Sequence, residues 1–141
     1  MFDPSREQVR SLFFEAWRKY RAGEPLVSGM ESLVVDIVLL HPEYHAPLSD
    51  PARFRDKDYT DESNPFLHMS LHMALEEQLS VDQPPGIASK FEAILKRIGE
   101  RHAALHEAIE CLAETMWRAQ RDGMPPDGAL YLECLSRRAR S

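Results

Sequence analysis

The stretch Asn64–Gln78, NPFLHMSLHMALEEQ, decides how the chain is interpreted. It opens with asparagine and proline, which favour the N-cap and the first turn of a helix, and the segment DQPPG follows it, so a helix is predicted between them. On a helical wheel, His68 and His72 share an arc with three leucines, and Glu76 lies between that arc and a second apolar patch. The stretch therefore predicts a helix that carries two histidines and a carboxylate into the protein interior.

The same spacing returns once, between His102 and Glu110, where the sequence reads HAALHEAIE. A helix is predicted from about Glu100 to Arg121, with His102 and His106 in its apolar stripe and Glu110 at the edge of it. The other members of the predicted stripe are Leu105, Ile109, Ala113, Met116 and Trp117. Both segments thus have the order His-x3-His-x3-Glu on a predicted buried face.

The third histidine pair is His41 with His45, in the segment HPEYH. All six histidines therefore fall into pairs four residues apart, whereas random placement would give roughly 0.2 such pairs. Pro42 cannot continue a regular helix, so the preceding helix is expected to end or kink at His41. That break either aims both rings at a site or leaves a turn with two surface histidines.

Histidines and carboxylates in a protein interior need compensation, because an unpaired buried carboxylate is costly or takes up a proton. Metal coordination is the interpretation that we favour, since helical bundles build metal sites from such residues on facing helices. A hydrogen-bonded His–Glu network and a protonation switch are the alternatives. The candidate metal ligands are His68, His72, Glu76, His102, His106 and Glu110, with His41 and His45.

The ligand types suit iron or zinc, with manganese as a further option, and their number suffices for two ions.

Two other carboxylates have alternative roles. Glu31 could reach the same interior or support the helix cap at Ser28, and Asp36 could orient an imidazole or pair with an arginine.

The rest of the chain is predicted to be helical between proline and glycine breaks. Further helices are expected at about 5–21, 28–40 and 87–98, with a short last helix at 126–138. The first would be capped by Asp3 and Pro4, the second could also be a strand, and Gly99 is a break or a kink. Residues 46–63 are predicted to be an irregular exposed loop. We therefore expect one all-α domain over residues 1–141, a bundle of four main helices plus one or two short helices.

Composition narrows the class of protein. The 141 residues carry a net charge of −6, and the one basic cluster, SRRARS, is interpreted as a solvated tail, so no nucleic-acid surface is expected. The longest apolar run, LVVDIVLL, is too short to span a membrane. The two cysteines have no CxxC spacing and are interpreted as reduced thiols of a cytoplasmic protein.

Several segments of the sequence together resemble a family of small bacterial proteins that is classed as a domain of unknown function. These segments are HPEYH, NPFLHMSLHMALEEQ, DQPPGI and HAALHEAIECLAETMW. The resemblance covers nearly the whole chain, beginning with the segment FDPSREQVRSLFFEAWRKY. It implies a small cytoplasmic helical protein and no particular activity. The HxxxH and HxxxE motifs are also similar in their chemistry to those of hemerythrin-type bundles, which hold two irons that bind oxygen. The motifs occur in a different order in this sequence, and the terminal HxxxxD motif of those bundles is missing.

We therefore expect a metal-binding protein that serves ligand binding, redox or oxygen sensing, or metal storage. The alternative is a structural or partner-binding module without metal. Catalysis by His and Glu alone ranks last, because the sequence has no GxSxG, P-loop or dinucleotide fingerprint. A homodimer could share the site if one chain presents only part of the required faces.

Overall fold

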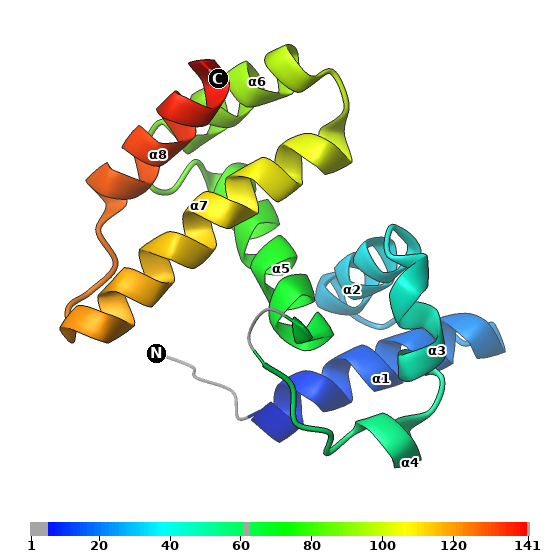
Figure 1. Ribbon diagram of the computed structural model, residues 1–141. Coiled ribbons are helices and arrows are strands. Elements are labelled where there is room, and N and C mark those ends of the chain that lie inside the picture. The colour runs from blue at the N-terminus through cyan, green and yellow to red at the C-terminus, as the bar shows by residue number, and fades with distance from the viewer. Residues whose placement is uncertain (1–5, 61–62, 141) are drawn as a thin grey trace. The chain divides into compact units, whose positions relative to one another are not determined.

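The computed structural model describes residues 6–60 and 63–140, and within them the chain forms eight α-helices and one 3-10 helix (Figure 1). The all-α class is confirmed, and no strand occurs in these residues. The predicted cap at Asp3 and Pro4 lies outside the described residues. The elements are α1 Arg6–Ala22, α2 Gly29–Leu39, η1 Pro42–Tyr44, α3 His45–Leu48, α4 Pro51–Phe54, α5 Pro65–Val81, α6 Ile87–Ile98, α7 Arg101–Asp122 and α8 Gly128–Arg140.

The chain divides into two compact units, Met1–Met73 and Ala74–Ser141, and the boundary falls within α5. A single domain over the whole chain stays a prediction. None of the helices among the described residues is both long and apolar enough to cross a membrane.

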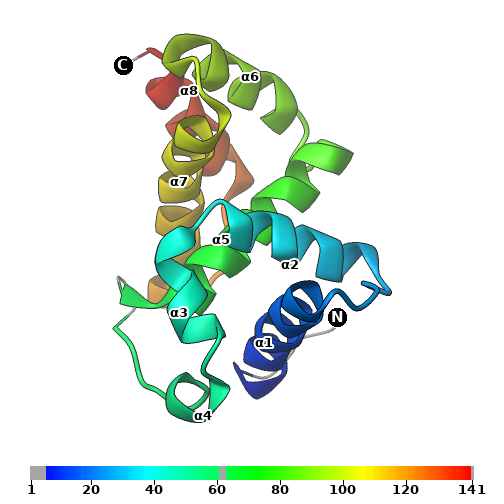
Figure 2. The same cartoon turned by 90° about the vertical axis from the view of Figure 1, so that its right-hand side faces the viewer.

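In the first unit, α1 packs against α2, as both views show (Figure 1 and Figure 2). The apolar faces of these helices form the core together with side chains from α3 and α5. Its buried members are Phe13, Phe14, Ala16, Trp17, Val34, Val35, Ile37, Val38, Leu48, Phe66 and Met69. The valines and isoleucine of α2 thus face a helical core, and tertiary packing overrides their preference for strands.

The start of α2 shows which role Glu31 has. Ser28 is the N-cap, and its side chain accepts a hydrogen bond from the backbone N–H of Glu31. The Glu31 carboxylate accepts hydrogen bonds from the Lys19 ammonium and from the backbone N–H of Val27. Glu31 therefore supports the helix cap, and its carboxylate is used there.

The segment 46–63, predicted as an irregular exposed loop, contains two short helices, so the prediction was wrong about its irregular structure, whereas most of its described side chains are exposed as predicted. Asp50 caps α4, where its side chain accepts a hydrogen bond from the backbone N–H of Arg53, and Pro51 occupies the first turn. The buried guanidinium of Arg10 donates to the carbonyl oxygens of Arg55 and Lys57. These hydrogen bonds hold the segment against α1 and satisfy a buried charge.

In the second unit, α6 packs against α8, and α7 packs against both. Gly99 has a φ of 83°, which ends α6 in a left-handed C-cap, so it is a break rather than a kink. Glu100 then caps α7. The predicted stripe of α7 was wrong at Met116 and Trp117, which are exposed, because α7 buries other side chains against its neighbours. The buried residues of α7 are Ala104, Leu105, Ala108, Ile109, Cys111, Leu112 and Thr115.

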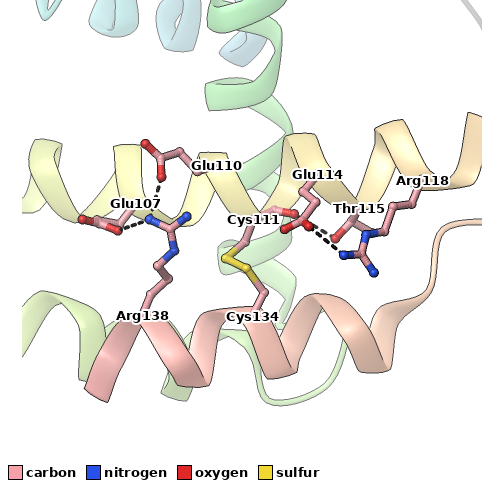
Figure 3. The surroundings of a disulfide bond; sticks show 8 residues. All are labelled: Glu107, Glu110, Cys111, Glu114, Thr115, Arg118, Cys134 and Arg138. Carbon is pink, nitrogen blue, oxygen red and sulfur yellow. Dashed lines mark hydrogen bonds and ion pairs between the residues drawn. A yellow bond between two sulfur atoms is a disulfide. The ribbon is translucent and has the colours of Figure 1, made fainter. Parts of the chain in front are cut away.

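The two cysteines form a disulfide, which corrects the expectation of reduced thiols (Figure 3). Cys111 of α7 and Cys134 of α8 lie 23 residues apart in sequence. Only the packing of two helices brings them together, so no local cysteine spacing could have predicted the bond.

Candidate metal centre

Two histidines of the centre come from α5. Asn64 caps this helix, as predicted, because its side chain accepts hydrogen bonds from the backbone N–H groups of Phe66 and Leu67. Residues four apart on a helix lie on one face, so His68 and His72 project side by side. His72 is buried and His68 is half-buried.

The third histidine, His41, follows the end of α2. Its ring nitrogen Nδ1 lies 2.7 Å from the carbonyl oxygen of Ile37. Because a carbonyl oxygen can only accept, the proton sits on Nδ1, and in the neutral ring Nε2 carries a lone pair. This hydrogen bond fixes both the tautomer and the direction of the ring, as carbonyl partners do for metal-ligating histidines. His41 is also buried.

The three rings direct their Nε2 atoms at one another. Nε2 of His68 lies 3.2 Å from Nε2 of His41 and 3.2 Å from Nε2 of His72. A ring nitrogen carries either one proton or one lone pair, so Nε2 of His68 can make only one good hydrogen bond of these two. Two nitrogens that bind one tetrahedral zinc at 2.0–2.1 Å are about 3.3 Å apart. The observed separations therefore match those of ligands to a common ion.

An aromatic side chain, Tyr44, packs against the histidine cluster. The ring of Tyr44 stacks on His41 with a centroid distance of 5.3 Å and an interplanar angle of 11°. Burial raises the pKa of the Tyr44 hydroxyl, with a smaller contribution from Glu43. Burial therefore disfavours the phenolate form of Tyr44.

The segment HPEYH directs its two histidines differently. Nε2 of His45 donates to the carbonyl oxygen of Val38 at 2.8 Å, and its ring lies 4.6 Å from that of Trp17. The break at Pro42 thus places His41 with His68 and His72, while His45 packs against α1. Within the first unit, His45 is not part of the Nε2 cluster.

The second unit carries the other pair, His102 and His106, in the first turns of α7. Their ring centroids are 4.2 Å apart, and both side chains are half-buried. The N-cap Glu100 lies beside them. The backbone N–H of Ala103 lowers the pKa of the Glu100 carboxyl, and nearby His102 and His106 add smaller effects in the same direction.

The two predicted carboxylate ligands each bind an arginine. Glu76 accepts two hydrogen bonds from Arg101, at 2.8 and 3.1 Å. Glu110, whose side chain is 62% exposed, forms an ion pair of 2.6 Å with Arg138. Sequence reasoning missed both arginines, and it was wrong to treat the basic end of the chain as a solvated tail. A wheel shows which face a carboxylate occupies but not which cation from another helix reaches it.

Comparison with known protein families finds a match, which covers most of the chain. Residues 5–137 match the family described as "Domain of unknown function (DUF1841)". The chain belongs to this family. All six histidines lie within the matched residues. No curated protein and no solved structure shows significant similarity to the chain.

The atoms of these histidines that could ligate a metal ion are ring nitrogens. His41, His72, His102 and His106 each offer a ring nitrogen that could ligate a metal ion, and His68 presents a further one to His41 and His72. Neutral imidazole suits zinc, iron, copper and nickel, whereas calcium and magnesium require oxygen ligands. The arrangement can therefore hold a transition-metal ion of intermediate softness.

Proposed function

We propose that this chain is a metal-binding protein whose centre is built on Nε2 of His41, His68 and His72. The observation that carries the proposal is the pair of 3.2 Å contacts that Nε2 of His68 makes with the other two rings. A metal ion accounts for both contacts at once, because it accepts a lone pair from every ring.

The preferred ions are zinc and ferrous iron. Both bind imidazole well, whereas manganese favours oxygen ligands, and the carboxylates expected to supply oxygen are bound to arginines. Three neutral nitrogens leave the charge of the ion uncompensated, which favours binding of an anion or of a polar small molecule at a further position. Sites with three histidines use that position for water or substrate. With iron, the proposed function is binding of oxygen or a related ligand as a redox signal.

We also propose that His102 and His106 are metal ligands. Their spacing repeats that of His68 and His72, and neutral imidazoles on one helical face can bind an ion together. This part of the proposal can fail separately, because a three-histidine centre completed by water would bind metal without them.

Elemental analysis of the purified full-length protein tests the proposal. Samples are measured as isolated and after reconstitution with zinc or, without oxygen, with ferrous iron, and a visible spectrum is recorded. We expect close to stoichiometric metal, and at least a tenfold loss in His68→Ala. Metal far below stoichiometric in every sample would overturn the proposal and leave a hydrogen-bonded histidine network.

Two double variants test the contribution of each unit. If both groups of histidines ligate metal, His41→Ala with His72→Ala and His102→Ala with His106→Ala should each lower the metal content. If the second pair does not contribute, only the first double variant loses metal. Circular dichroism of both variants checks that the helices persist.

A further inference from the structure

The disulfide of the second unit borders a pocket that the metal proposal does not use. The pocket has a volume of about 410 Å³ and lies where the end of α7 and the connection after it meet α8. Cys134 lines it, together with Thr115, Leu130 and Met124. Figure 3 shows the disulfide between α7 and α8, with Thr115 and Arg118 on one side of it along α7.

Solvent has more access to Cys134 than to Cys111. Cys134 is 6% exposed and belongs to the wall of the pocket, whereas Cys111 is fully buried and does not line it. Thiol–disulfide exchange requires that a thiolate reach one sulfur of the bond, so access helps to decide which sulfur is attacked. The pocket offers an approach to Cys134.

The polar side chains of the pocket suit a small polar thiol. Arg118, Arg121 and Arg137 line it, as do Glu114, Asp122 and Asp127. Several of these carboxylates already have partners: Glu114 pairs with Arg118, Asp122 pairs with Arg121, and Asp127 accepts hydrogen bonds from the first backbone N–H groups of α8. The charged side chains of the pocket can hydrogen-bond the polar groups of a small thiol.

Other contacts hold α8 in place on both sides of the disulfide. The Tyr131 hydroxyl donates to the side chain of Gln78 at 2.8 Å, and burial raises the pKa of this hydroxyl well above its usual value. Arg138 binds Glu107 and Glu110, as Figure 3 shows. Cleavage of the disulfide would therefore leave α8 attached, so that the bond can form again.

We propose that the pocket is a thiol-exchange site at which a low-molecular-mass thiol attacks Cys134. The thiolate forms a bond to Sγ of Cys134, the Cys111–Cys134 bond breaks, and Sγ of Cys111 leaves with the electron pair and takes up a proton. A second thiol molecule then attacks the sulfur of the first, which releases Cys134 as a thiol and a small-molecule disulfide. Overall, two small thiols are oxidised and one protein disulfide is reduced.

Trapping the mixed disulfide tests the proposal directly. The oxidised full-length protein is treated briefly with limiting reduced glutathione, quenched with acid, alkylated and mapped by mass spectrometry. We expect glutathione on Cys134 and the alkyl group on Cys111, in at least tenfold excess over the reverse. Equal labelling, glutathione mainly on Cys111, or no adduct without denaturant would overturn the proposal.

Two further measurements keep the test independent of folding defects. Leu130→Trp places a large ring in the pocket and should slow exchange at least fivefold, whereas Met30→Trp, at an exposed position of α2, should not. The thiol of Cys134 in Cys111→Ser should react with Ellman's reagent at least tenfold faster than that of Cys111 in Cys134→Ser. Equal rates in variants that retain their circular dichroism spectrum would contradict the assignment.

Discussion

The two His-x3-His-x3-Glu segments contain the same residues in the same order, yet their surroundings differ. His68 and His72 meet a third ring, His41, which a different segment supplies with its tautomer fixed by a backbone carbonyl. His102 and His106 face each other at 4.2 Å on one helix of the other unit. A repeated motif is therefore not always a repeated site, because the group that completes it comes from elsewhere in the chain.

The carboxylates of the two segments, in contrast to the histidines, have similar surroundings. Glu76 and Glu110 occupy equivalent positions in the repeat, and each is bound by an arginine of the second unit. The repeat therefore keeps a helical face that carries His, His and Glu, but the third member of each set serves in an ion pair.

The largest effect should come from removing the ring that distinguishes the two segments. His41→Ala eliminates one of three converging nitrogens, so we expect at least a hundredfold loss of zinc affinity in competition with a chromophoric chelator. His45→Ala is the matched control from the same segment, and its affinity should stay within twofold of the wild type. Similar losses in both variants would show that the Nε2 cluster is not the site.

Removal of the disulfide should be next in size, and it affects the second unit. Replacing both cysteines by alanine releases a cross-link across 23 residues, which should cost about 2–4 kcal/mol and lower the Tm by about 10 °C. Scanning calorimetry measures the change relative to the oxidised wild-type protein, and the reduced wild-type protein should behave like the variant. An unchanged Tm would mean that packing of α6, α7 and α8 alone sets the stability of this unit.

Neutralising the carboxylates should have a small effect on metal binding. In Glu76→Gln and Glu110→Gln we expect the metal content to stay within twofold of the wild type, because the arginines already bind these groups. The exposed ion pairs should contribute about 0.5 kcal/mol or less to stability. A tenfold loss of metal in either variant would instead make that carboxylate a ligand, as the sequence alone suggested.

The smallest effect concerns Glu31, a carboxylate bound by a cation in the first unit. Its hydrogen bond from Lys19, followed by that from Val27, lowers the pKa of the Glu31 carboxyl below its ordinary value of 4.5. Its contribution to stability is therefore fully present above pH 4.5 and is lost as the pH falls through the lowered value. Thermal unfolding from pH 7 to pH 3 should show a smaller acid-dependent loss in Glu31→Gln. An identical pH dependence would contradict this assignment.

Much of the helical structure could be predicted because its signals are local. Asn64 with Pro65, Gly99 with Glu100, and Ser28 act within one turn, and each marks a helix end in the structure. The start of α4 carries a similar local signal, Asp50 with Pro51, but a helix of one turn is not stable by propensity alone. Hydrogen bonds from Arg10 to the carbonyl groups of Arg55 and Lys57 hold the chain that follows it. Propensity carries little information about such contacts.

The sequence by itself determined the helical class, the caps and the faces on which the histidines lie, because these depend on residues within one or two turns. Only the tertiary structure decided that His41 joins His68 and His72, that His45 does not, and that Arg101 and Arg138 bind the glutamates. It also decided that Cys111 bonds to Cys134. The physical reason is that ligation, ion pairing and disulfide formation depend on separations of a few ångströms between groups far apart in sequence, which helical periodicity does not fix.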